Sequence, residues 1–539
     1  MKYVIGVDFG TLSARALLVN AENGKEIATC ESPYLHGVMD KTLPCGKALP
    51  KKCALQMPSD YINSLSSATK EVIKKANIDP CDVIGIGIDF TASTVFPIDE
   101  TGTPLCESEK YNNEPHAYVK LWKHGTATEE ADDITELAKS RGEYWIGKYG
   151  GKISAELMLP KILETARKCP ELYRDTHTFI EAGDWINLVL TGEDRRSPAF
   201  AGYKIMWDAE NGYPKNDFFK ALDPILDNIA GTKLPNNVCK SITESGGKLN
   251  KRGSEITGLC EGTQVALAMI DAHASMAGLG VVGSGDIVLI IGTSTCHILN
   301  SSEKRDVKGI SGYVKDGIFP GIYTYEAGQS GVGDMFAWFV KNSVPAAYQS
   351  EADEKGVNIH TLLTEKAREL KIGESGITVL DWFSGNRSIL SNSALTGLIF
   401  GLNLQTKPEE IYRAMLESTA FGTRVILEQY EKYGITISNV TATGGIANKN
   451  NLMMQIYADV LGKDIKIAST ALSGALGSAI YAAAAAGAHS SINDAVAAMS
   501  VTSQKTVSPI EENVKKYDAL YKKYRELHDY FGEIKFKDR

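Results

Sequence analysis

The sequence of 539 residues lacks the patterns typical of secreted, disulfide-rich or zinc-binding proteins. Its nine cysteines are odd in number and scattered, and no two of them form a C-x-x-C pair. We therefore expect a reduced chain with neither a disulfide framework nor a zinc site. The first residues show no basic segment followed by an apolar one, so no secretory leader is expected.

Long apolar runs and an excess of positive charge are missing as well. The longest apolar stretch, residues 471–488, is rich in alanine and glycine and is broken by serines. It is shorter than the roughly 20 residues of a membrane span and predicts a tightly packed internal helix pair. The net charge is −9, so binding to nucleic acid or to an anionic membrane is not expected.

What the chain does have is the composition of a large globular protein, with 43% apolar and 23% charged residues. Hydrophobic cores stop growing near about 250–300 residues, so a chain of this length should divide. We predict two domains, residues 1–264 and residues 265–539, with the boundary just before the apolar run at 265–270.

The most informative segment lies at the start of the chain. An apolar strand delivers Asp8 into a tight turn, and a second strand, residues 16–19, leads away from it. Such a turn can hold Mg²⁺ near Asp8 while Gly10, Thr11 and Ser13 offer backbone and hydroxyl donors to a phosphate. A plain β-hairpin is the alternative, because short motifs often match by chance.

A similar turn recurs far downstream. The apolar run at residues 288–291 ends in Gly292, Thr293 and Ser294, and a strand resumes after them. Two such hairpins about half the chain apart indicate an internal duplication in which each half presents one phosphate loop.

A third loop, at Gly444 and Gly445, lies between a predicted strand at 435–441 and a predicted helix with apolar positions from 452 to 460. Paired glycines at a strand end let an adenine or a ribose approach the backbone. Asn448 can form a hydrogen bond there or cap the start of the helix. An ordinary strand–helix loop is the alternative.

The first hundred residues predict a β-β-β-α-β order. The pair Asn23-Gly24 is a strong hairpin signal that makes a three-stranded meander of the first strands. Ser59 is the predicted cap of an amphipathic helix. Residues 83–89 read as a fully buried strand whose glycines permit close approach of a neighbouring backbone.

The paired hairpins and the Gly-Gly loop resemble the superfamily of actin, Hsp70 and sugar kinases. Residues 397–402 and 410–417 are similar to the C-terminal signature of the FGGY carbohydrate kinases. A second signature of that family, Lys-apolar-x-Trp, is poorly matched at residues 161–164. The resemblance implies an α/β fold with two ribonuclease H-like domains and an interdomain cleft, ATP and Mg²⁺ as cofactors, and a cytoplasmic enzyme. A homodimer is also expected from the resemblance.

The resemblance also implies roles for particular residues. Asp271 would be the catalytic base, although by position alone it could cap the helix that follows, and His273 would be structural. Asp8 and Asp271 would serve the metal. The nucleotide would be held by Gly10, Thr11, Ser13, Arg15, Gly292, Thr293, Ser294, Gly401, Gln405, Gly444, Gly445 and Asn448.

Six further segments resemble the members of this family that phosphorylate L-ribulose: residues 89–94, 115–123, 149–154, 201–207, 325–330 and 385–388. By that likeness the ketopentose would contact Ala92, Lys204, Asp271 and Glu326. The expected reaction transfers the γ-phosphoryl group of ATP to O5 of L-ribulose, in L-arabinose catabolism. The alternatives are a kinase of the same family for D-ribulose, xylulose or ribitol, and an ATPase of the actin or Hsp70 type.

Overall fold

The computed structural model describes residues 1–468, 470, 472–501 and 504–533. The chain forms two compact units, and neither is a continuous half of it. The first contains the described residues of 1–282, 313–324 and 472–502, and the second those of 283–312, 325–471 and 503–539. The predicted domain boundary between residues 264 and 265 stays a prediction.

The sheet of the first unit has the strand order β3-β2-β1-β5-β10-β9, with β11 also beside β5. Strands β1, β2 and β3 are antiparallel neighbours, which confirms the meander, and β5 runs parallel to β1. Strands β10 and β11 are parallel to β5, so their carboxyl ends point to the same edge as those of β1 and β5. The bounds are β1 Tyr3–Phe9, β2 Ser13–Asn20, β3 Glu26–Pro33, β5 Val83–Phe90, β9 Ser245–Lys248, β10 Gln264–Ala266 and β11 Met269–Ile270.

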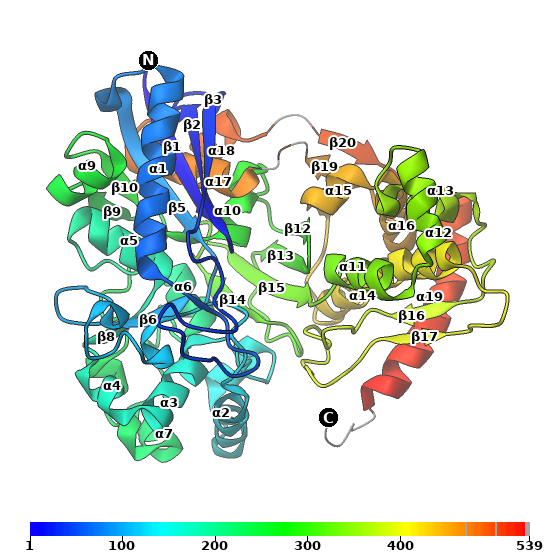
Figure 1. Cartoon of the computed structure of the whole chain (residues 1–539), viewed down its shortest axis with the longest axis horizontal. Helices are drawn as coiled ribbons and strands as arrows, with labels where there is room; N and C mark the ends of the chain where they lie inside the picture. The colour runs from blue at the N-terminus through cyan, green and yellow to red at the C-terminus, as the bar shows by residue number, and fades with distance from the viewer. Residues whose placement is uncertain (469, 471, 502–503, 534–539) are drawn as a thin grey trace. The chain divides into compact units, whose positions relative to one another are not determined.

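One face of this sheet packs against helix α17, Ser473–Ala485 (Figure 1). A Cβ atom on Gly6 would lie 1.8 Å from the carbonyl oxygen of Ala475, and one on Gly87 would lie 2.0 Å from that of Ser478. Glycine is therefore required where the helix backbone meets the sheet. This agrees with the prediction that the glycines of residues 83–89 permit close approach of a neighbouring backbone.

The small-residue stretch at 471–488 forms one helix rather than two. Within its described residues the helix is α17, and its packing partner is α10, Asp271–Gly278, from another part of the chain. A Cβ atom on Gly477 would lie 1.8 Å from the carbonyl oxygen of Ala274. The prediction of tight helix packing is therefore confirmed. The prediction that both helices of the pair lie within residues 471–488 is wrong.

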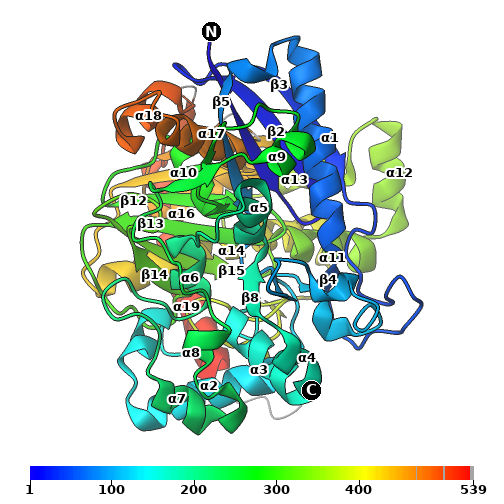
Figure 2. The ribbon, with the colours of Figure 1, turned by 90° about the vertical axis from the view of Figure 1, so that its left-hand side faces the viewer.

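The other face of the sheet carries helix α1, Pro58–Ala76, which lies beside β2 and β3 (Figure 2). The helix begins at Pro58, with Met57 as its N-cap, and not after Ser59 as predicted. Proline at the first helical position fixes φ at a helical value and needs no hydrogen bond there.

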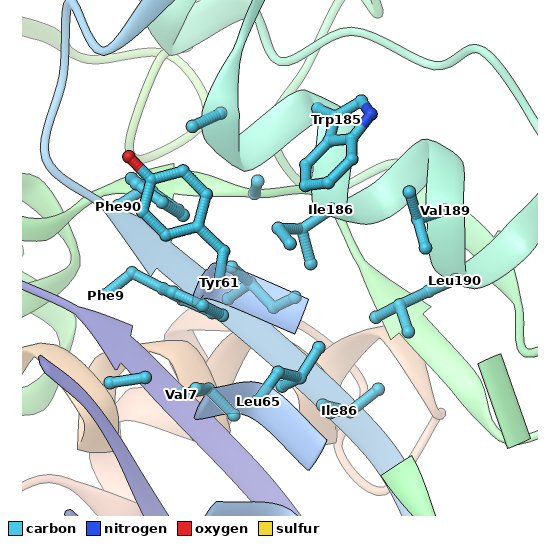
Figure 3. Packing of buried hydrophobic residues seen from close by; sticks show 14 of the residues in the cluster. Val7, Phe9, Tyr61, Leu65, Ile86, Phe90, Trp185, Ile186, Val189 and Leu190 are labelled. Atoms are coloured by element: carbon cyan, nitrogen blue, oxygen red, sulfur yellow. The ribbon is translucent and has the colours of Figure 1, made fainter. Parts of the chain in front are cut away.

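Aromatic side chains fill the core on this face (Figure 3). The rings of Phe9 and Phe90 stack 4.7 Å apart, and Tyr61 of α1 meets Phe90 edge-on at 4.9 Å. Trp185 and Ile186 of helix α5, Ala182–Thr191, belong to the same cluster.

A smaller sheet of the first unit has the order β4-β7-β6-β8. Its strands are β4 Leu55–Gln56, β6 Val95–Ile98, β7 Val119–Lys120 and β8 Thr178–Glu181. The other helices of this unit are α2 Thr128–Arg141, α3 Met158–Lys168, α4 Pro170–Asp175, α6 Pro198–Lys204, α7 Asn216–Leu222, α8 Ile229–Thr232, α9 Lys251–Thr257 and α18 Ile492–Met499.

The second unit repeats the arrangement of the first. Strand β12 is antiparallel to β13 and parallel to β18, as β1 is antiparallel to β2 and parallel to β5. This repetition agrees with the duplication predicted from the paired turns. The strands are β12 Asp286–Ile291, β13 Thr295–Ser301, β15 Tyr323–Gln329, β18 Asn439–Thr443, β19 Ile465–Ala468 and β20 Gln504–Val507, with a hairpin of β16 Thr378–Leu380 and β17 Leu398–Phe400.

The helices of the second unit are α11 Gly333–Ser343, α12 Ala346–Glu354, α13 Ile359–Glu369, α14 Pro408–Lys432, α15 Gly445–Lys449, α16 Asn451–Leu461 and α19 Glu511–Glu533. Most of β14, Gly312–Lys315, groups with the first unit.

The structure corrects one expectation about cysteine. Cys81 and Cys260 form a disulfide, whereas the thiols of Cys30, Cys45, Cys53, Cys106, Cys169 and Cys239 are free. The two residues are 179 positions apart and precede the neighbouring strands β5 and β10, so only the fold brings them together. Among the described residues, no helix is both long enough and apolar enough to span a membrane.

Candidate functional site

Three carboxylates meet at the carboxyl edge of the first unit's sheet. Asp8 of β1 lies directly opposite Asp89 of β5, and β11, which pairs with the end of β5, leads into Asp271. Successive side chains of a strand point to opposite faces. Since Phe9 and Phe90 face the core under α1, Asp8 and Asp89 face α17 instead.

Asp89 is the most enclosed of the three. Its side chain is fully buried, and Ser478 of α17 donates a hydrogen bond of 2.6 Å to its Oδ2 atom. The Oδ1 atom is buried and has no hydrogen-bond partner. Burial and then the negative charge of Asp8 raise the pKa of Asp89 well above its usual range. Burial also raises the pKa of Asp8, against the opposing charge of Arg15.

These carboxylates suit a hard divalent cation. Mg²⁺ prefers oxygen ligands and is usually held by one or two carboxylates together with substrate phosphates. Asp8 and the unpartnered oxygen of Asp89 supply such ligands. No group of three or more His, Cys, Asp or Glu residues in the described part of the chain could hold a metal alone. Phosphate oxygens of a bound substrate are the ligands that usually accompany one or two carboxylates at such a site.

Asp271 is the first residue of α10, and the N-cap is Ile270, so the alternative role of Asp271 as a helix cap is wrong. Its Oδ1 atom accepts a hydrogen bond of 2.6 Å from the backbone N–H of Ala272. The side chain of Asp271 is half-buried, whereas His273 is fully buried, with its ring tilted against that of Tyr203 at a centroid distance of 4.5 Å. The structural role of His273 stays a prediction.

The first turn is closed by a hydrogen bond of 3.0 Å from the N–H of Gly10 to the carbonyl oxygen of Ser13. The Ser13 hydroxyl donates to Glu31 at 2.6 Å, and Arg15 donates to Asp8 at 3.4 Å. The hydroxyl of Thr11 accepts from Trp122 Nε1 at 3.2 Å, and Thr11 is half-buried. Thr11 thus offers the more accessible of the two hydroxyl groups in this turn.

Glu181 is a buried neighbour both of the loop that carries Ala92 and of Lys204, two of the predicted sugar contacts of this unit. Ala92 is half-buried in a loop whose other members, Thr91 and residues 93–94, are buried. Lys204 ends α6 and is 7% exposed. Burial raises the pKa of Glu181, and the charges of Lys161 and, more weakly, of Lys204 oppose that effect. Glu181 also accepts a hydrogen bond from the N–H of Thr94 in the loop.

In the second unit, two of the predicted loops lie together. The N–H of Gly292 donates to the carbonyl oxygen of Ser294 at 2.9 Å, which closes the turn between β12 and β13. Gly444 has φ +103°, and a Cβ atom there would lie 2.4 Å from the carbonyl oxygen of Ile291. Only glycine allows this approach. The turn at residues 292–294 and the Gly-Gly loop therefore form one surface.

The remaining predicted residues of the second unit are more exposed. Gly445 has open space around it, and Asn448 donates to the carbonyl oxygen of Gly444 at 3.2 Å. Asn448 does not cap α16, because Asn450 accepts from the N–H of Met453 and takes that role. Gly401 and Gln405 lie in an exposed segment after β17, and Glu326 is half-buried in β15.

Sequence reasoning missed three buried charged residues, Asp89, Lys161 and Glu181. Asp89 is the last residue but one of a largely apolar strand, as Asp8 is, and Glu181 is the last residue of β8. A carboxylate near the end of such a strand was the available signal. Lys161 lies in α3 beside apolar residues in the sequence, and this pattern gave no signal of its role.

Two family models match the chain. One, for the N-terminal domain of the FGGY family of carbohydrate kinases, matches residues 3–278, and the other, for the C-terminal domain, matches residues 287–486. The ribulokinase of Bacillus licheniformis is 47% identical over 527 residues, which cover 97% of this chain and 95% of that protein. The ribulokinase of Mycolicibacterium smegmatis is 44% identical over 533 residues, with coverages of 98% and 94%.

Solved structures share the fold. The xylulose kinase from Rhodospirillum rubrum has a TM-score of 0.78 at 22% identity, with 98% of this chain and 99% of that one covered. The Plasmodium falciparum glycerol kinase with ADP has a TM-score of 0.77 at 18% identity, with 99% of each chain covered. The duplicated α/β fold, the paired turns and the matches over both units lead to one conclusion: this chain belongs to the FGGY family of carbohydrate kinases.

Proposed function

We propose that the chain transfers the γ-phosphoryl group of ATP to the O5 hydroxyl of L-ribulose, giving L-ribulose 5-phosphate and ADP, as a step of L-arabinose catabolism. The observation that carries this proposal is identity of 42–47% to ribulokinases over at least 97% of the chain. The xylulose and glycerol kinases share the fold at far lower identity and therefore support the fold alone.

Asp271 is the proposed catalytic base. It orients the O5 hydroxyl and accepts its proton as the new O–P bond forms and the bond to ADP breaks. Phosphoryl transfer depends mainly on positioning and charge stabilisation, so an ordinary carboxylate suffices. The half-buried position of Asp271 at the sheet edge supports this role.

The phosphates are proposed to bind the turns at residues 10–13 and 292–294, with Arg15 beside the first and the Gly-Gly loop beside the second. Asp8, with Asp89 or Asp271, would hold Mg²⁺, which supplies positive charge that neutralises the transferred group when it is bound. In the proposed complex the adenosine lies on Gly401, Gln405, Gly444, Gly445 and Asn448.

The pentulose is proposed to contact Ala92, Lys204, Asp271 and Glu326. An ammonium and a carboxylate can donate to and accept from sugar hydroxyls, while a small residue such as Ala92 leaves room for the carbon chain. A cytoplasmic location is proposed because the reaction consumes ATP and because the thiols of Cys30, Cys45 and Cys53 are free. The homodimer expected from the resemblance stays a prediction for sedimentation analysis.

The test is a coupled ADP-release assay with Mg·ATP and a panel of L-ribulose, D-ribulose, D-xylulose, ribitol, L-arabinitol and glycerol. We expect kcat/KM for L-ribulose to exceed that for every other member by about tenfold or more. Phosphorus NMR of the product should show the phosphate on C5. If kcat/KM were higher for another polyol, the protein would still be a sugar kinase, but L-ribulose would be the wrong substrate.

A further inference from the structure

One peptide group in the loop of residues 91–94, between β5 and β6, is held at both ends by charged side chains. The Nζ atom of Lys161 donates to the carbonyl oxygen of Ser93 at 2.6 Å. The Oε2 atom of Glu181 accepts from the N–H of Thr94 at 3.0 Å. This carbonyl and this N–H belong to the same peptide unit. Because they point in opposite directions across a trans peptide, Lys161 and Glu181 hold it from opposite sides.

Both side chains are deeply buried. Lys161 is 1% exposed and Glu181 is 3% exposed. Lys161 comes from α3 and also donates to the carbonyl oxygen of Leu121 at 2.9 Å, while Glu181 ends β8. Two buried charges cost several kcal/mol of desolvation each unless they are compensated, so aliphatic side chains would fill this space at lower cost.

The two charges compensate each other in part. Burial lowers the pKa of Lys161, and the charge of Glu181 opposes that effect. Burial raises the pKa of Glu181, and the charge of Lys161 opposes it in turn. Lys161 also faces Lys120 and the carboxylates of Glu156 and Glu164, and Glu181 also faces Asp184 and Lys204.

The loop needs such a restraint. Ser93 has φ +57°, a left-handed conformation that costs energy for a residue with a side chain. The hydroxyls of Thr91 and Thr94 are 2.9 Å apart, and the N–H of Ala182 donates to the carbonyl oxygen of Thr94 at 2.8 Å. Ala92 is the one loop residue that is not buried. Rotation of the 93–94 peptide would therefore move the residue that the loop presents.

We propose that Lys161 and Glu181 are positioning residues for the sugar: together they fix the 93–94 peptide, which sets the place of Ala92, and Glu181 also restrains Lys204 through its charge. The inference rests on the proposed function, in which Ala92 and Lys204 contact the pentulose. It predicts effects on sugar binding and selectivity that leave nucleotide binding unchanged.

The test compares Lys161→Met with Lys168→Met. Methionine keeps an unbranched chain and removes the ammonium. Lys168 lies on the same helix, is exposed and pairs with Glu164 at 3.0 Å, so it is the matched control. We expect Lys161→Met to raise KM for L-ribulose about tenfold or more while KM for ATP changes less than about twofold. Lys168→Met should leave both values unchanged.

A second pair of variants keeps the proposal testable if Lys161→Met does not fold. Glu181→Gln retains an oxygen that can accept from Thr94, and Glu181→Leu does not. The glutamine variant should therefore raise KM for L-ribulose less than the leucine variant does. Equal KM values for the sugar in the wild type and in the folded variants would overturn the positioning role, as would equal losses for sugar and ATP.

The outcomes separate this inference from the proposed function. If the wild type prefers another polyol, the assigned sugar is wrong, and the same KM comparison is made with that polyol. If the wild type phosphorylates L-ribulose and all variants match it, only the positioning role fails. A wild type that phosphorylates no member of the panel would overturn both.

Discussion

At the scale of single residues, the site depends on how side chains alternate along β1 and β5. Asp8 could be predicted because it stands beside a recognisable turn. Asp89 could not, because its importance follows from the register that sets it opposite Asp8, and register is a property of the folded sheet. Lys161 and Glu181 were missed for the same reason, since their shared peptide lies far from both in sequence.

Replacing Asp89 with asparagine should separate stability from activity. Asp89→Asn removes the buried member of two facing carboxylates and keeps the shape of the side chain, so we expect the free energy of unfolding to rise by about 1 kcal/mol. The loss of a candidate cation ligand should raise the Mg²⁺ concentration needed for half-maximal activity. Urea unfolding and a Mg²⁺ titration measure the two effects. A less stable variant with an unchanged Mg²⁺ requirement would contradict both expectations.

The hydroxyl of Ser478 should matter more than that of Ser473 on the same helix. Ser478→Ala leaves the buried Asp89 carboxyl without its hydrogen bond and should cost about 1.5–3 kcal/mol of unfolding free energy. Ser473 bonds only to the neutral hydroxyl of Ser275 among the contacts described, so Ser473→Ala should cost about 1 kcal/mol. Equal losses in urea unfolding would mean that Asp89 does not depend on Ser478.

At the scale of elements, the parts that are local in sequence were predictable. The β-meander, the two Gly-Thr turns, helix α1 after the meander and helix α16 after the Gly-Gly loop follow from turn residues and apolar periodicity. The helix that packs onto Gly6 and Gly87 could not be predicted, because this helix, α17, comes from the far end of the chain. The sequence showed that something must approach the sheet closely, and only the fold shows what does.

A substitution of Gly87 tests this packing. Gly87→Ala would bring a methyl group to 2.0 Å from a carbonyl oxygen of α17, so either the helix or the strand must move. We expect a loss of roughly 2–3 kcal/mol of unfolding free energy. Gly125→Ala is the control, because its nearest neighbours would be 3.9 Å away, and it should change stability by less than about 0.5 kcal/mol. Similar stabilities of the two variants in urea would show that α17 does not pack as described.

At the scale of the whole molecule, the α/β fold and its duplication were predicted correctly. The interleaving of the two units was not predicted. Residues 472–501 belong to the first unit, although most of the second unit precedes them in the sequence. The disulfide between Cys81 and Cys260 could not be predicted either, because the number and spacing of cysteines do not show which strands become neighbours.

A buried histidine makes the molecule sensitive to acid. Burial lowers the pKa of His297 to about 3, whereas an exposed histidine titrates near about 6.5. The unfolded chain then binds the proton more tightly, so the free energy of unfolding should fall as the pH drops from about 6.5 toward 3, by up to about 1.4 kcal/mol per pH unit.

His297→Gln should flatten this dependence, since glutamine does not titrate and can still bond to Thr423. The exposed His177 provides the control, and His177→Gln should leave the slope of stability against pH unchanged. The measurement is urea unfolding across this pH range. Identical slopes for wild type and His297→Gln would contradict the buried, neutral state of His297.

The measurement that tests the central claim most directly is sugar-dependent ADP release by the wild type and by Asp271→Ala. We predict strong turnover with L-ribulose in the wild type and a loss of about 10²-fold or more in kcat for the variant, with ATP binding retained. ATP hydrolysis that needs no sugar and survives Asp271→Ala would contradict the proposed sugar phosphorylation and the assigned base together.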